Sequence, residues 1–167
     1  MFGVDKQWGA IKASWQEIRD RSSSYTKPQN YDVHTRLVAT IQSMIIDLAD
    51  ASGVTLDPEM DSYYLQDTSL VKLLALAESI GKLRAKGVGI LAAQTSSPEE
   101  RAEIAMLSGS IVDYDRAVRQ NLTKATAQRA NLKAELTVAA DNITSLIKSL
   151  QQSVTRDVMV DTPTMQP

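Results

Sequence analysis

The stretch from Leu70 to Leu83 reads LVKLLALAESIGKL. Its large apolar residues recur at intervals of three and four, the spacing that places side chains on one face of an α-helix. Lysine and glutamate stand between them, so the opposite face is polar. The stretch predicts an amphipathic helix whose apolar face packs against other helices.

The same helix extends beyond this stretch in both directions. Asp57 is suited to cap its first turn, and Pro58 has the backbone angle that fits the first helical position. We therefore predict a helix over residues 58–94, about 55 Å long at about 1.5 Å per residue. Three glycines weaken its far end and predict close helix packing or a bend there. They are Gly81, Gly87 and Gly89.

Two helices are predicted before this one. The first covers residues 3–22, where Trp8 and Trp15 lie on one face and are expected to pack in the seam between helices. It ends near residue 21 because Pro28 disfavours a helical residue before it. The second covers residues 30–52, where an apolar seam starts at Val33 and Gly53 is placed to end the helix. Both helices carry their apolar residues at helical spacing, as a bundle requires.

Two more helices are predicted after it. Ser97 and Glu100 have the spacing of a capping box and start a helix over residues 98–121. The apolar pattern resumes over residues 131–156. We place a turn in the weak helical stretch between these two, and the alternative is one continuous helix from residue 98 to residue 156. Residues 157–167 are predicted to be a tail.

The composition supports an all-α fold. Glycine and proline are few, at 7 and 5 residues of 167, and aromatic residues make up only 5%. The long middle stretches favour residues that lose little rotamer freedom in a helix. We predict a single module over residues 1–167, an up-down antiparallel bundle of four to five long helices.

Several classes of function are disfavoured. The chain has no cysteine and one histidine, His34, so thiol chemistry and the usual zinc spacings are missing. No phosphate-binding glycine loop or nucleophile elbow occurs. We therefore predict no enzyme, catalytic residue, metal or cofactor. The 18 basic residues nearly balance 20 acidic ones and are scattered, which argues against nucleic acid as a partner. No stretch reaches the roughly 18 apolar residues of a membrane helix.

Two charges interrupt the apolar seam of the predicted helix over residues 58–94. Asp67 and Arg84 stand in line with its apolar residues but are 17 residues apart, about 25 Å along the axis, so they cannot pair with each other. Each needs a partner on another helix, in water or in a ligand. One interpretation is that both face solvent or form structural ion pairs.

The other interpretation is a polar cavity between the helices over residues 30–52 and 58–94. In that cavity an arginine would hold an anion through two parallel hydrogen bonds, and tyrosines would line the wall. The predicted ligand-binding residues are Arg36, Tyr63, Tyr64, Gln66 and Arg84.

Residues 56–67, LDPEMDSYYLQD, resemble a segment in the sensory regions of bacterial methyl-accepting chemotaxis receptors and related sensor kinases. The likeness includes DLADAS at residues 47–52 and LRAKG at residues 83–87, and it covers residues 33–90. Members of this family generally carry more helical sequence on both sides of the segment. Their ligands vary widely, so the resemblance names no ligand.

The resemblance implies an extracytoplasmic, periplasmic ligand-sensing module of a transmembrane chemoreceptor or sensor kinase. It would bind a small molecule or a periplasmic binding protein, act as a homodimer and pass a shift in helix packing to signalling domains. The membrane helices would lie outside this chain. The alternative is a structural or adaptor helical bundle whose apolar seams serve protein–protein assembly.

Overall fold

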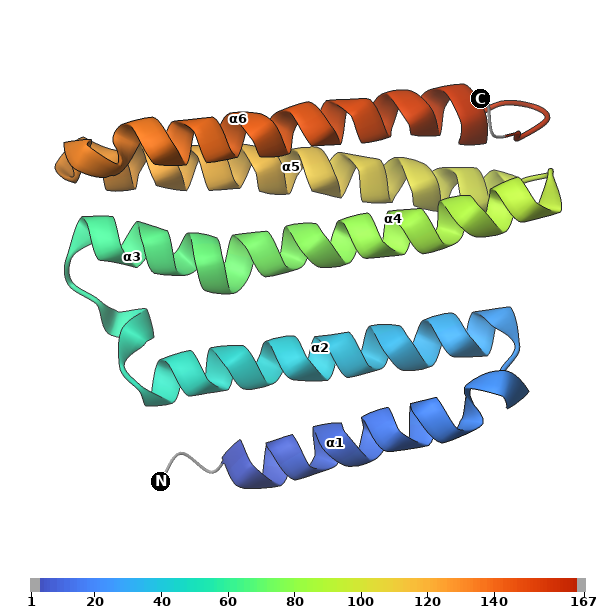
Figure 1. Cartoon of the computed structure of the whole chain (residues 1–167), viewed down its shortest axis with the longest axis horizontal. Helices are drawn as coiled ribbons and strands as arrows, with labels where there is room; N and C mark the ends of the chain where they lie inside the picture. The colour runs from blue at the N-terminus through green and yellow to red at the C-terminus, as the bar shows by residue number, and fades with distance from the viewer. Residues whose placement is uncertain (1–3, 165–167) are drawn as a thin grey trace. The chain divides into compact units, whose positions relative to one another are not determined.

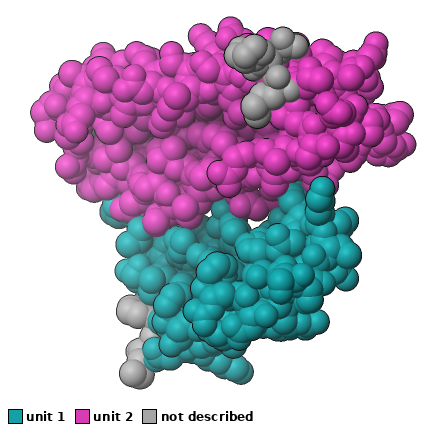
Figure 2. Space-filling model, turned by 45° about the vertical axis from the view of Figure 1, so that its right-hand side comes forward, with its two compact units in different colours: residues 1–58 teal, residues 59–167 magenta. Residues whose placement is uncertain are grey.

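The computed structural model describes residues 4–164, except for the side chain of Gln128. Helices make up 89% of the structure and no strand occurs among the described residues, so the prediction of an all-α fold is confirmed. The chain divides into two compact units, one ending at Pro58 and one starting at Glu59 (Figure 2). A single module over residues 1–167 stays a prediction.

The first unit is a hairpin of two helices. It consists of α1 (Val4–Arg21), a 3₁₀ turn (Ser22–Ser24) and α2 (Lys27–Ala51), which lie side by side in Figure 1. Its core cluster consists of the buried residues Ile11, Ile18 and Leu37. The predicted helix over residues 3–22 is confirmed, apart from residue 3, which lies outside the described residues.

Helix α2 begins earlier than predicted because a second capping box precedes it. Thr26 accepts a hydrogen bond from the Gln29 backbone N–H (3.4 Å), and the Gln29 side chain accepts one from the Thr26 N–H (2.9 Å). Pro28 therefore lies within the first turn, where its missing N–H removes no helical hydrogen bond. The prediction of a start at residue 30 is wrong for this reason.

The two tryptophans do not form the seam of the hairpin. Trp8 and Trp15 remain 49% and 50% exposed, whereas Ile11 and Ile18 are buried. Two helices cover only a narrow stripe of each other, and the isoleucines fill it. The indoles are left at its margin, where the edge of Trp15 meets the ring of His34. The prediction of tryptophan core packing is wrong.

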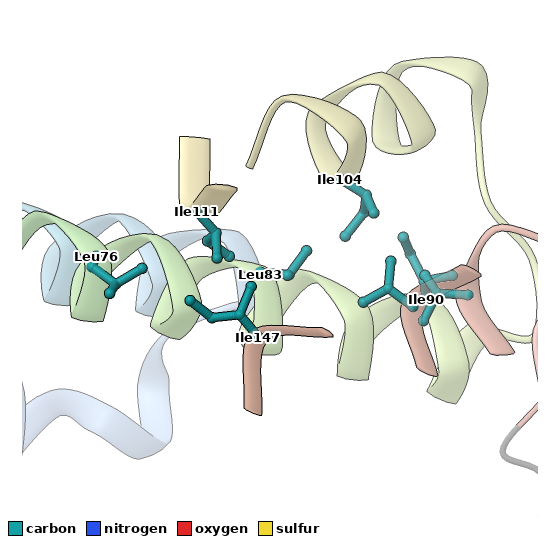
Figure 3. Packing of buried hydrophobic residues seen from close by; sticks show 8 residues of the cluster. Leu76, Leu83, Ile90, Ile104, Ile111 and Ile147 are labelled. Carbon is teal, nitrogen blue, oxygen red and sulfur yellow. The ribbon is translucent and has the colours of Figure 1, made fainter. Parts of the chain in front are cut away.

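The second unit is a bundle of helices packed against one another (Figure 1). Its elements are α3 (Met60–Asp67), a π-helical turn (Thr68–Lys72), α4 (Leu73–Ala93), α5 (Pro98–Gln128), α6 (Ala130–Ser153) and a second π-helical turn (Val154–Val158). Its core joins α4, α5, α6 and the second π-helical turn (Figure 3), and the buried residues are Leu76, Leu83, Ile90, Ile104, Ile111, Ile147, Val154 and Val158.

Helix α3 begins later than predicted. A 3₁₀ turn, Val54–Leu56, precedes it, and Asp57 follows that turn in an extended conformation. The N-cap of α3 is Glu59, whose carbonyl accepts from the Tyr63 N–H at 2.9 Å. The predicted helix start at Pro58 is therefore wrong, because the chain stays extended until residue 59.

The interruption of the long helix is not near its glycines. It is the π-helical turn Thr68–Lys72, where the Leu73 N–H donates to the carbonyl of Thr68. Added Cβ atoms at Gly81 and Gly89 would meet nothing within 4 Å, and one at Gly87 would lie 3.8 Å from Val158. Close packing is thus found at Gly87 alone among the three.

The structure confirms the predicted start of α5 and the predicted break between α5 and α6. Ser97 and Glu100 form the predicted capping box, with hydrogen bonds of 3.1 Å and 2.8 Å. Helix α5 then runs past its predicted end at residue 121 to Gln128. The break is at Arg129 (φ −123°, ψ 72°), within the stretch where a turn was expected, so the continuous helix is excluded.

Residues 157–164 fold back onto the second unit and do not form a tail, although Asp161 and Thr162 are exposed. Asp157, Val158 and Pro163 are buried, and the Thr164 N–H donates to the Asp157 carbonyl at 3.1 Å. The second π-helical turn carries Val158 into the core, which the fading apolar pattern did not indicate. The remainder of the predicted tail, residues 165–167, lies outside the described residues.

Candidate functional site

A cluster of polar residues joins α3 to the last third of α5. Asp61, Thr68 and Asn121 are 9%, 4% and 8% exposed, in a unit whose other core residues are mostly aliphatic. Buried polar groups need hydrogen-bond partners in the protein, because a buried group without one loses its hydrogen bonds to water and gains none in exchange. The positions of these partners therefore determine how α3 lies on α5.

Asp61 connects the first turn of α3 to the turn between α5 and α6. Its carboxylate accepts a hydrogen bond from Arg129 Nε and another from the Ser62 backbone N–H at 2.8 Å. The Arg129 contact first, and then the Ser62 N–H, lower the pKa of Asp61 below its ordinary value, because both favour the ionised form. Asp61 is thus held as a carboxylate against the turn.

Asp67 anchors the other end of α3. Asn121 Nδ2 donates to Asp67 Oδ2 at 2.6 Å, and Lys72 Nζ lies 3.6 Å from the same oxygen, across the π-helical turn. The acid that interrupts the apolar pattern therefore has protein partners on another helix and on its own, as the structural interpretation predicted.

Two tyrosines lie between these anchors. The rings of Tyr63 and Tyr64 meet edge to face with centroids 5.2 Å apart. Lys124 of α5 donates to the Tyr64 hydroxyl at 3.1 Å and lies 4.7 Å from its ring centroid. Gln66, on the same helix, is half-buried. Three of the five predicted ligand-binding residues thus share α3.

The two predicted arginines do not join them. Arg84 is exposed on α4, about 30 Å along the helix axis from Tyr64, so a single small site cannot contain both. Arg36 is an exposed residue of α2, in the first unit. The roles of Arg36 and Arg84 in ligand binding stay predictions.

Two cations contact α3, Lys124 at Tyr64 and Arg129 at Asp61, and sequence reasoning missed both. They lie in the stretch that was predicted to be a turn, and no spacing within one helix indicates which residues of another helix face it. An anion that competes for Lys124 or Arg129 would remove a contact between α3 and α5, so the arrangement suits reversible control of helix packing.

No group of three or more histidine or acidic residues within residues 4–164 is placed to hold a metal ion. Across the described part of the chain, every helix is too short or too polar to cross a membrane. Comparison with protein families, with curated proteins and with solved structures found no match.

Proposed function

We propose that this chain is the extracytoplasmic ligand-sensing module of a bacterial chemoreceptor or sensor kinase, which binds a small molecule and transmits a change in helix packing. One observation carries the proposal. The segment that resembles receptor sensory regions, residues 56–67, includes α3, and Asp61 and Asp67 hold α3 to the α5–α6 turn and to α5 through polar contacts directly before a π-helical turn.

The π-helical turn gives such contacts a means of transmission. A π-helical turn accommodates one more residue than the regular helix, and such turns are frequent at functional sites. If a ligand draws Lys124 or Arg129 away from α3, the turn at Thr68–Lys72 is the point where α3 can shift or rotate without unwinding α4. A shift of this kind moves the core residues of α4 against α5.

The proposal extends to the arrangement of the whole receptor module. We propose an up-down antiparallel bundle of four to five long helices that works as a periplasmic homodimer without catalysis and is joined to the membrane by helices outside this chain. In the second unit, Asp61 near the start of α3 contacts Arg129 after the end of α5, and Lys86 near the end of α4 contacts Glu103 near the start of α5. The helices α3 and α4 therefore run opposite to α5. This pairing supports the antiparallel order.

A thermal-shift screen against organic acids, amino acids and aromatic acids tests the binding function. A ligand at about 100 times its dissociation constant adds roughly 2.7 kcal/mol to the free energy of unfolding. We expect at least one hit whose affinity falls on Tyr64→Phe or Lys124→Ala. A screen in which no compound raises the melting temperature would contradict the sensing function.

Transmission needs a separate measurement. The chain has no cysteine, so cysteines placed at exposed Ala85 of α4 and Ser145 of α6 take up spin labels at those two positions alone. We expect the distance between the labels, measured by pulsed electron spin resonance, to change when a hit from the screen is added. An unchanged distance distribution at a saturating ligand concentration would show that the ligand binds without changing helix packing, and would contradict the proposed transmission.

A structural or adaptor bundle is the second candidate, and one observation favours it. A groove of about 350 Å³ runs between α4 and α6 and is lined only by apolar residues, among them Ile80, Ile143 and the 71% exposed Leu146. Exposed apolar surface of this kind marks many protein–protein contacts. If Leu146→Glu abolishes association with a helical partner while the ligand screen stays empty, the adaptor function is correct.

A further inference from the structure

A second cavity lies on the other side of α5, between its last third and the beginning of α6. Its volume is about 270 Å³. Leu122 and Leu136 form its apolar walls with two alanines, and three threonines contribute hydroxyl groups. Small-molecule sites have this character, with apolar walls and a few polar groups that fix orientation.

The charged residues that line this cavity are both cations, Arg119 of α5 and Lys133 of α6. A largely apolar cavity with two positive charges and no carboxylate in its wall favours an anionic ligand. The nearest acids to Arg119 are Asp115 and Asp141, and neither lines the cavity.

Arg119 is held in place before any ligand arrives. Its Nε donates to Thr144 at 2.7 Å, and its Nη2 donates to the Ala140 carbonyl at 3.1 Å and to Asp141 at 2.9 Å. Thr144 in turn donates to the buried carboxylate of Asp115 at 2.8 Å. These bonds leave the donors of Nη1 without an acceptor among the described residues, so the guanidinium is preoriented and still able to bind an anion.

Lys133 stands at the opposite end of the cavity. Arg119 contacts Ala140, and by the same antiparallel register Lys133 lies level with Thr126, which places the two backbone positions about 10 Å apart along the axis. Within residues 4–164, apart from the side chain of Gln128, Lys133 makes no hydrogen bond or ion pair. It is therefore the cation whose charge is least compensated in the cavity.

We propose that the α5–α6 cavity binds a short aliphatic dicarboxylate, with one carboxylate on Arg119, the other on Lys133 and the methylene chain between Leu122 and Leu136. The two separated cations match two separated carboxylates, and the apolar walls match the chain between them. This inference deepens the proposed sensing function, on which it rests, by naming a ligand class and a site distinct from the tyrosines of α3.

Isothermal titration calorimetry with glutarate tests the site, with butyrate and glutaramide as probes that carry one charge and none. We expect glutarate to bind more tightly than either. Lys133→Ala removes no hydrogen bond or ion pair within the described residues, so its fold should be unchanged, and we expect it to weaken glutarate binding by about tenfold or more. Arg119→Lys keeps the charge but not the planar fork, and it should weaken binding as well.

Matched controls are available on the same two helices. Arg116 pairs with Asp113 at the surface of α5, and Lys148 is exposed on α6, and neither lines the cavity. Arg116→Ala and Lys148→Ala should bind glutarate as the unaltered chain does. If they weaken binding as much as Lys133→Ala does, glutarate binding depends only on the net charge of the chain, and the proposed site is wrong.

Two further outcomes separate this site from the proposed function. If glutarate does not bind, or binds Lys133→Ala unchanged, while another hit from the thermal-shift screen binds and changes the α4–α6 label distance, the chain is a sensor and this cavity is not its dicarboxylate site. If no anion or other small molecule binds at all, both the site and the sensing function are contradicted.

Discussion

At the start of α3, Asp61 shows how one residue couples distant parts of the second unit. Its carboxylate contacts Arg129 at the α5–α6 turn and the backbone of Ser62. Because the folded state lowers the pKa of Asp61, the ionised form stabilises folding at pH values above the ordinary carboxyl range. That contribution decreases as the pH falls through this range and is lost below the lowered pKa of the folded state.

A prediction follows for Asp61→Asn. The urea midpoint of this variant should be below that of the unaltered chain at pH about 7, and the difference should decrease as the pH falls through and below the ordinary carboxyl range. Asp113→Asn, which removes an exposed carboxylate from a surface ion pair, is the control and should change the midpoint little. A difference that persists at low pH would show that Asp61 acts through packing and not through its charge.

Ser97 carries a second prediction at this scale. Its side chain accepts from the Glu100 N–H, so Ser97→Ala should lower the free energy of unfolding by about 1 kcal/mol. Ser145→Ala, at an exposed position inside α6, provides the comparison and should be neutral or slightly stabilising, since alanine is the better helix former. Equal urea midpoints for the two variants would mean that α5 is held at its start by other contacts.

At the scale of single elements, the sequence predicts those helix ends that depend on neighbouring residues. The capping box at Ser97 and the break before residue 130 were predicted because caps and weak helical stretches depend on neighbouring residues. The π-helical turn Thr68–Lys72 contains neither glycine nor proline, so nothing in its residues indicates it. We infer that it arises because α3 must turn its acids toward α5, a requirement that only the folded unit imposes.

Deletion of Ser69 tests this account of the π-helical turn. Removing one residue should restore a regular helix and rotate α3 by about 100° relative to α4. Asp61 and Asp67 would then leave Arg129 and Asn121, so we expect a lower urea midpoint and a loss of cooperativity. Ser69→Ala retains the residue count and should keep the cooperative transition. A deletion variant as stable as the unaltered chain would show that the extra residue does not orient α3.

At the scale of the molecule, the contacts that define the candidate site join residues far apart in the chain. Asn121 and Asp67 are 54 positions apart, and Arg129 and Asp61 are 68 positions apart. Helical periodicity assigns a residue to a face, but it does not give the register between two helices. For this reason the tyrosines of α3 could be proposed as site residues from the sequence, whereas Lys124 and Arg129, which contact α3, could not.

The two compact units lead to the last prediction, which concerns their separate stability. Among the described residues, the core cluster of the second unit has eight buried apolar residues from α4, α5, α6 and the second π-helical turn, whereas the core cluster of the hairpin has three. Burial of apolar area is the main favourable term in folding, and chains of about 60 residues bury a smaller fraction of their surface than longer ones. We therefore expect a fragment of residues 59–167 to be helical by circular dichroism and to unfold in urea with a sigmoidal transition. A fragment of residues 1–58 should be less helical than its hairpin structure requires and should lose its signal gradually. If the larger fragment also unfolds gradually, the core of the second unit is insufficient alone, and the chain must fold as the single module that its sequence first suggested.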